Sequence, residues 1–133
     1  MNRVRTQASL FAALLSLLAR EVYSIEIVAE LAARASELLR GTLHLENVHL
    51  RLGDGRKGWP EAAPFERILV TAAPAAIPGA LVEQLSPGGR MVIPVGPDPE
   101  LQSLRLFRRG NDGVSRAVDL LPVRFVPLTG GDG

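Results

Sequence analysis

The sequence contains no cysteine among its 133 residues. Disulfides and thiolate metal ligands are therefore excluded, and this composition suits a reducing compartment such as the cytoplasm. Histidine is scarce as well, because only His44 and His49 occur, so we expect no metal site. No sign of charge dominates, since 15 lysines and arginines stand against 14 acidic residues. We therefore expect no basic face and no nucleic acid partner.

Hydrophobic runs long enough to span a bilayer are also lacking. The most apolar stretch, residues 8–19, follows Arg3 and Arg5 and so resembles a secretory signal. It is too short for a transmembrane helix, and no convincing cleavage site follows it. We interpret residues 8–20 as a buried helix, and we expect a cytoplasmic protein with no membrane partner.

The remaining composition fits one folded domain over residues 1–133. Hydrophobic residues make up 47% of the chain and the mean hydropathy is +0.16, so a core can form. Helical and strand patterns alternate and then end in a hairpin, which predicts an α/β fold: an incomplete doubly wound, Rossmann-like sheet with a C-terminal antiparallel hairpin. The predicted elements are a helix over 8–20, a strand over 22–25, a helix over 28–40 capped by Gly41, strands over 48–52 and 65–71, a helix over 78–85, a tight turn over 86–89, a strand over 90–95, and a hairpin of 102–109 with 114–121.

Candidate ligand groups follow three of the predicted strands. In α/β folds, ligands bind outside the carboxyl ends of parallel strands. Glu26 could accept hydrogen bonds from both hydroxyls of a ribose there, or it could be a solvated glutamate. The glycines around Asp54 could let a ligand approach the backbone, or they could form a plain turn. Thr71 and the small residues after it leave room for a ligand, so the three positions together predict a nucleotide site.

Longer motifs give a more specific indication. Leu85-Ser86-Pro87-Gly88-Gly89-Arg90, followed by Ile93-Pro94-Val95-Gly96, and the segment from Leu120 to Leu128 are the most informative. With residues 20–26, 53–60 and 68–73 they resemble protein-L-isoaspartate O-methyltransferases in both order and spacing. The similarity extends over residues 12–129.

The resemblance implies S-adenosylmethionine as cofactor and isoaspartyl residues of damaged proteins or peptides as substrate. It implies that Glu26 holds the ribose hydroxyls and that Ile27 lies against the adenine. Asp54 would accept from the adenine amino group beside the Gly55 amide, and Thr129 matches a position that reaches the cofactor in some members.

Two features of that family have no counterpart in this sequence. The family places a strand ending in a glycine-rich loop ahead of the first helix, together with a substrate-binding serine motif. No glycine precedes Gly41, and Ser9 and Ser16 do not match the serine motif. We therefore nominate no catalytic residue, and we expect an N-terminally truncated domain with little or no activity.

The missing strand would lie between the strands at 22–25 and 68–71, leaving two unpaired edges. These strands could pair directly, another chain could fill the gap, or the chain could be a poorly stable product of truncation, which we favour. Two other functions compete with the methyltransferase. One is a non-catalytic interaction module that forms oligomers through its strand edges. The other is a nicotinamide-dependent oxidoreductase, against which the absent glycine fingerprint counts.

Overall fold

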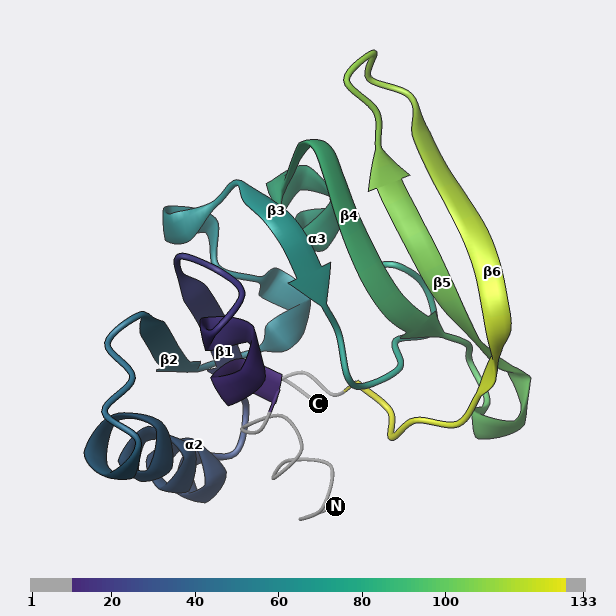
Figure 1. The fold of residues 1–133 in the computed structure, drawn as a ribbon. Coiled ribbons are helices and arrows are strands. Elements are labelled where there is room, and N and C mark those ends of the chain that lie inside the picture. Colours follow the sequence, from purple (N-terminus) through teal and green to yellow (C-terminus); the bar gives the residue numbers. More distant parts are fainter. Residues whose placement is uncertain (1–10, 129–133) are drawn as a thin grey trace. The chain divides into compact units, whose positions relative to one another are not determined.

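The computed structural model describes residues 11–128. The chain forms two compact units that divide between Gly55 and Arg56. Each unit has its own sheet (Figure 1). Each also has its own cluster of buried side chains. Both units combine helices with strands, so the predicted α/β class is confirmed. The single domain expected over residues 1–133 stays a prediction.

The first unit is built on two parallel strands. β1 (Val22–Glu26) and β2 (Val48–Leu52) match in register along their whole length. The connection between them contains α2 (Ala29–Ser36) and a π-helical segment, η1 (Glu37–Thr42). Both predicted strands are confirmed, since the boundaries agree to within one residue.

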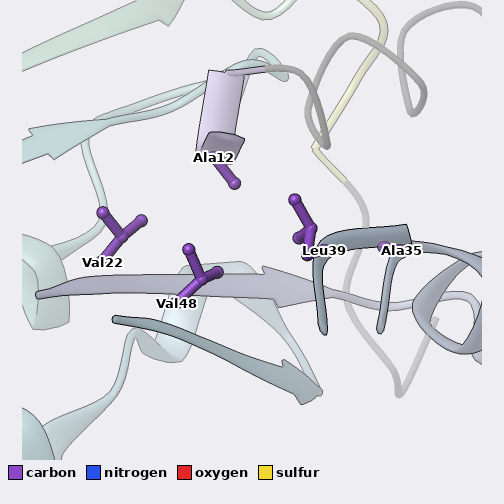
Figure 2. Close-up of a cluster of buried hydrophobic side chains, with 5 residues drawn as sticks. All are labelled: Ala12, Val22, Ala35, Leu39 and Val48. Atoms are coloured by element: carbon purple, nitrogen blue, oxygen red, sulfur yellow. The ribbon is translucent and has the colours of Figure 1, made fainter. Parts of the chain in front are cut away.

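The core of this unit lies on one side of the two strands. Figure 2 shows Val22 and Val48 projecting from neighbouring strands to the same side, where Leu39 and Ala12 approach them. Paired residues of a parallel ladder share a face of the sheet, so the register places both valines together. The buried cluster consists of Ala12, Val22, Ala35, Leu39 and Val48.

The first helix is shorter than predicted. Within the described part of the chain, residues 11–16 are helical and residues 17–20 are not. The side chain of Asn47 donates to the backbone oxygens of Ser16 (2.8 Å) and Ala19 (3.2 Å). These bonds satisfy carbonyls at the helix end, where no intrahelical donor is available. Leu17 and Leu18, just beyond this helix end, are 78% and 85% exposed, contrary to their expected burial.

The second helix also ends differently from the prediction. The expected helix over 28–40 becomes π-helical after Ser36, and Gly41 lies inside η1 rather than in a left-handed cap. The left-handed position falls at His44, with φ 53°. In the wider turn the Leu43 amide donates to the Leu38 oxygen (2.9 Å). This winding keeps Leu39 in the core, at 1% exposure.

The second unit contains a mixed sheet of four strands in the order β3-β4-β5-β6. β3 and β4 are parallel, and the other two pairs are antiparallel. The buried cluster joins α3 to one face of this sheet. The bounds are β3 (Phe65–Leu69), α3 (Gly79–Gln84), β4 (Leu85–Val95), β5 (Gln102–Arg109) and β6 (Ser115–Val123), with short 3-10 turns at η2 (Gly55–Lys57), η3 (Pro60–Ala62) and η4 (Pro99–Leu101).

The C-terminal hairpin is confirmed. The Gly110 amide donates to the Val114 oxygen (2.9 Å), and Asp112 Oδ1 accepts from the Val114 amide (3.0 Å). Gly113 has φ +83°, a conformation that glycine adopts without strain. The returning strand runs over Ser115–Val123 instead of 114–121.

Three further boundaries in this unit differ from the prediction. β3 ends at Leu69. The Leu69 side chain is 46% exposed rather than buried, because it projects from the face opposite that of Ile68 and Val70, which pack against the buried cluster. Pro78 is the N-cap of α3 and lies just before its first turn. The predicted tight turn over 86–89 lies within β4 and shifts its register with β3. Phe65 pairs with Leu85 and Arg67 pairs with Arg90, so a step of two residues along β3 matches a step of five along β4.

The two strands expected to flank a gap belong to different sheets. Within residues 11–128, the ladder of β1 is with β2 and the ladder of β3 is with β4; direct pairing of β1 with β3 stays one of the predicted alternatives. Each strand therefore presents a row of backbone groups outside any ladder, which is the feature of an edge strand. None of the helices in this part of the chain is long and apolar enough to cross a bilayer.

Candidate functional site

Glu26 and Asp54 come from the same end of the two-stranded sheet. Glu26 is the last residue of β1 and pairs with Leu52, the last residue of β2. The Gly53 amide donates to the Glu26 backbone oxygen at 2.9 Å, which continues the ladder one step further. Asp54 follows immediately. Two acidic side chains thus stand at the carboxyl ends of adjacent parallel strands, where α/β proteins bind ligands.

The carboxylate of Glu26 also takes part in local structure. Its Oε1 accepts a hydrogen bond from the Val28 amide at 3.1 Å. Val28 is the N-cap of α2 and offers no side-chain acceptor of its own. A carboxylate in this position satisfies a donor at the helix start and lies at the positive end of the helix dipole. Glu26 is therefore oriented by α2, with the half-buried Ile27 between the strand and the helix.

The backbone of the turn after β2 does not require glycine at position 53. Gly53 does not have a positive φ. A Cβ added to it would contact only Ile25 Cγ2, at an ordinary van der Waals distance of 3.8 Å. Neither backbone strain nor internal packing explains this glycine. Space for a ligand beside the Asp54 backbone stays our interpretation, and Gly55 begins the next turn, η2.

The other two predicted site residues, Thr71 and Thr129, do not belong to the described part of the first unit. Thr71 belongs to the second unit, two residues beyond the end of β3, and is half-buried. The turn after it pairs with the C-terminal segment, because the Ala73 amide donates to the Val126 oxygen (2.8 Å) and Ala73 bridges Pro127. Thr129 lies outside the described residues.

Gln84 is a structural residue of the second unit that the sequence argument missed. It is 7% exposed, and its side chain holds the loop that follows η2. Gln84 Oε1 accepts from the Trp59 amide (2.8 Å), and Nε2 donates to the Lys57 oxygen (2.9 Å). Both ends of the amide are thus satisfied, as burial requires. The sequence did contain an indication of this burial. Gln84 is three residues after Leu81, so both lie on the same, buried face of α3.

Gly58 lies under this clamp, so replacing it should be costly. Its φ is +63°, and an added Cβ would lie 2.1 Å from Gln84 Oε1. We expect Gly58→Ala to lower the free energy of unfolding by about 2–4 kcal/mol, since left-handed strain adds to loss of the clamp. Urea denaturation measures this. Gly79→Ala is the matched control, because nothing lies within 4 Å of its added Cβ; an equal loss in both variants would contradict the explanation.

The two histidines are placed apart from the acidic cluster. His44 occupies the left-handed position after η1. His49 Nε2 lies 2.7 Å from Glu21 Oε2, and its ring stacks on Tyr23 with centroids 4.7 Å apart. Among residues 11–128, no three histidine, cysteine or acidic side chains are grouped as metal ligands would be.

Comparison with known proteins gives a consistent family. The family model described as protein-L-isoaspartate(D-aspartate) O-methyltransferase matches residues 6–133. A protein-L-isoaspartate O-methyltransferase 1 from Anaeromyxobacter sp. (strain Fw109-5) is 65% identical over 121 residues, covering 91% of this chain and 57% of the relative. A protein-L-isoaspartate O-methyltransferase from Myxococcus xanthus (strain DK1622) is 56% identical over 122 residues, covering 89% and 56% respectively. The chain thus spans somewhat more than half the length of these curated relatives.

Solved structures agree on the fold. One protein-L-isoaspartate O-methyltransferase matches with a TM-score of 0.76 and 30% identity, over 85% of this chain and 35% of the other. A second structure, of a putative protein from Plasmodium falciparum in complex with S-adenosyl-L-homocysteine, matches with a TM-score of 0.70 and 23% identity, over 82% and 52%. The motifs that carried the resemblance, the arrangement of strands and the family match over residues 6–133 agree. This chain belongs to the protein-L-isoaspartate(D-aspartate) O-methyltransferase family.

Proposed function

We propose that this chain provides the adenosine-binding side of an S-adenosylmethionine-dependent protein carboxyl methyltransferase. The observation that carries the proposal is the placement of Glu26 and Asp54 beyond the ends of two registered parallel strands, in a chain that matches the family over nearly its whole length. Two carboxylates there are acceptors for the donors that an adenosine offers: the ribose hydroxyls and the adenine amino group.

Each first-unit residue has a role in this proposal. Glu26 would accept from the ribose hydroxyls, and Val28 would keep its carboxylate in place. Ile27 would supply an apolar surface for the adenine, while Asp54 would accept from the adenine amino group and the Gly55 amide would lie beside it. These residues fit the nucleoside because the two carboxylates would accept from its hydroxyl and amino donors and the apolar side chain would lie against its ring. Thr71 and Thr129 are proposed to complete the site from the rest of the chain.

The substrate of the whole protein is proposed to be the free carboxylate of an isoaspartyl residue in damaged proteins. The cofactor's sulfonium supplies the electrophilic methyl group, so the protein's task is to align the carboxylate with it. When bound, the cofactor would give its methyl group to an oxygen of that carboxylate and would leave as S-adenosylhomocysteine. The resulting ester can collapse to a succinimide, which returns part of the material to normal aspartate. The cysteine-free sequence supports a cytoplasmic location.

Calorimetric titration with S-adenosylhomocysteine tests the adenosine site directly. We expect saturable binding to the 133-residue chain, weaker than to a full-length relative, because the residues proposed to hold the adenosine are present. Circular dichroism on the same sample reports whether the chain is folded. A folded chain without binding would contradict the proposal and favour a non-catalytic interaction module, a role consistent with the positions of β1 and β3 at the ends of their sheets.

A further inference from the structure

Four arginines form a single row across the sheet of the second unit. Arg67 pairs in register with Arg90, Arg90 with Arg108, and Arg108 with Arg116. Residues opposite each other on neighbouring strands project to the same face, about 4.8 Å apart in the pairing direction. All four side chains are exposed. The balanced net charge predicted no basic face, and that expectation is wrong for this row.

The charge of this arginine row is not compensated within the described part of the chain. None of the four arginines forms an ion pair with a described acidic residue; Arg67 donates instead to the Glu66 backbone oxygen (2.8 Å). Elsewhere in the same unit, Arg105 pairs with Asp119 (2.8 Å). Like charges placed directly opposite one another destabilise a sheet. An anion bound along the row would therefore reduce the repulsion between the facing arginines, which no described acidic side chain reduces.

An apolar row runs beside the arginine row on the same face. Two residues further along each strand, Leu69 pairs with Val92, Val92 with Leu106, and Leu106 with Val118. Val118 is 56% exposed, and Leu69 at the other end is nearly half exposed. The buried cluster that includes α3 uses the residues in between, such as Met91, which point to the opposite face. The face away from α3 thus presents cations and apolar side chains in adjacent lines.

A pocket at the hairpin end adds room for a bound group. It has a volume of about 420 Å³ and is lined by Arg108, Arg116 and residues of the hairpin turn. The turn contributes one acid, Asp112, whose Oδ1 already accepts from the Val114 amide. Two guanidinium groups therefore outnumber the single carboxylate in the pocket, which favours a negatively charged occupant.

We propose that this face binds an acidic polypeptide segment in which carboxylates lie next to apolar side chains. The arginine row matches the carboxylates, and the apolar row matches the side chains beside them. A nucleic acid fits less well, because the two rows contain no aromatic side chain on which a base could stack. The proposal goes beyond methyl transfer and does not depend on the adenosine site, so either can fail without the other.

Fluorescence anisotropy with a labelled peptide of glutamate and leucine tests the proposal on the whole chain. We expect saturable binding that weakens with added salt, and no binding of the same peptide with lysine in place of glutamate. The double variant Arg108→Gln, Arg116→Gln should bind about tenfold more weakly. The matched control is Arg34→Gln, Arg124→Gln, which removes the same charge from arginines already paired with Glu30 and Glu100 and should change the affinity by less than about twofold.

Thermal unfolding checks that the row variants are folded. They should melt at the same or a higher temperature, because repulsion between facing arginines is removed; if the double variant is unstable, Arg116→Gln alone on the outer strand replaces it. Equal affinity for wild type and row variant would overturn the proposal, as would an equal loss in the control. Single-stranded DNA that bound as tightly as the peptide, with the same dependence on the row, would also overturn it by assigning the face to nucleic acid.

Discussion

The 133-residue chain should methylate an isoaspartyl peptide at least about a thousandfold more slowly than a full-length relative. Positioning of reactants contributes roughly 7–11 kcal/mol to such reactions, and losing about 4 kcal/mol of it already slows the rate about a thousandfold. Residues 1–40 contain no glycine, so these 133 residues by themselves supply none of the glycine-rich loop that the resemblance implies for the methionine end of the cofactor. Without such a loop, the methyl group of a bound cofactor would not be held in line with the carboxylate.

Transfer of labelled methyl groups from S-adenosylmethionine to the peptide measures this difference. The relative from Anaeromyxobacter, 65% identical over the shared region, is the reference. The same relative cut back to the region that matches this chain is the control, because it has the same extent with its own side chains. Turnover of this chain within about tenfold of the full-length reference would contradict the prediction. An active cut-back relative would assign the loss to substitutions in this chain.

Local sequence patterns predicted the strands of the first unit and the C-terminal hairpin, but not the ends of the helices. β1 follows from a short stretch typical of a buried strand, and β2 follows from alternation of apolar and polar residues. The hairpin follows from two glycines around Asn111-Asp112. The end of the first helix could not be found in this way, because Asn47, 28 to 31 residues away, fixes it. The π-helical winding of η1 similarly depends on tertiary contacts: Leu39 is buried in the core, and Arg40 Nη2 donates to the Val48 oxygen at 2.7 Å.

In the candidate site, too, the features set by local sequence were predicted and those set by tertiary contacts were not. The sequence predicts that Glu26 and Asp54 end neighbouring strands, since each follows a strand pattern directly. It does not predict the bond from the Val28 amide to Glu26, which requires the geometry of the helix start. The arginine row cannot be predicted from any one strand, because each strand contributes one arginine and only the registers of four strands align them. The net charge of +1 does not show the row either, because it sums charges over the whole sequence regardless of their positions.

Glu26→Ala should weaken S-adenosylhomocysteine binding by about ten- to a hundredfold. Hydrogen bonds to a charged acceptor contribute roughly 1.5–3 kcal/mol, and the methyl side chain of alanine accepts none. The same change removes the acceptor for the Val28 amide, so we also expect a loss of about 1 kcal/mol in the free energy of unfolding. Calorimetric titration and urea denaturation of one sample measure the two effects separately.

Glu26→Gln separates the binding role from the structural one. Glutamine keeps an oxygen for the Val28 amide, so stability should recover most of the loss. It removes the charge that strengthens bonds to the ribose hydroxyls, so binding should stay roughly fivefold or more below wild type. If both variants bind as tightly as wild type while only Glu26→Ala unfolds more easily, the carboxylate serves solely to begin α2. If binding falls in both and stability falls only in the alanine variant, the carboxylate contacts the ligand and α2 holds it in position to do so.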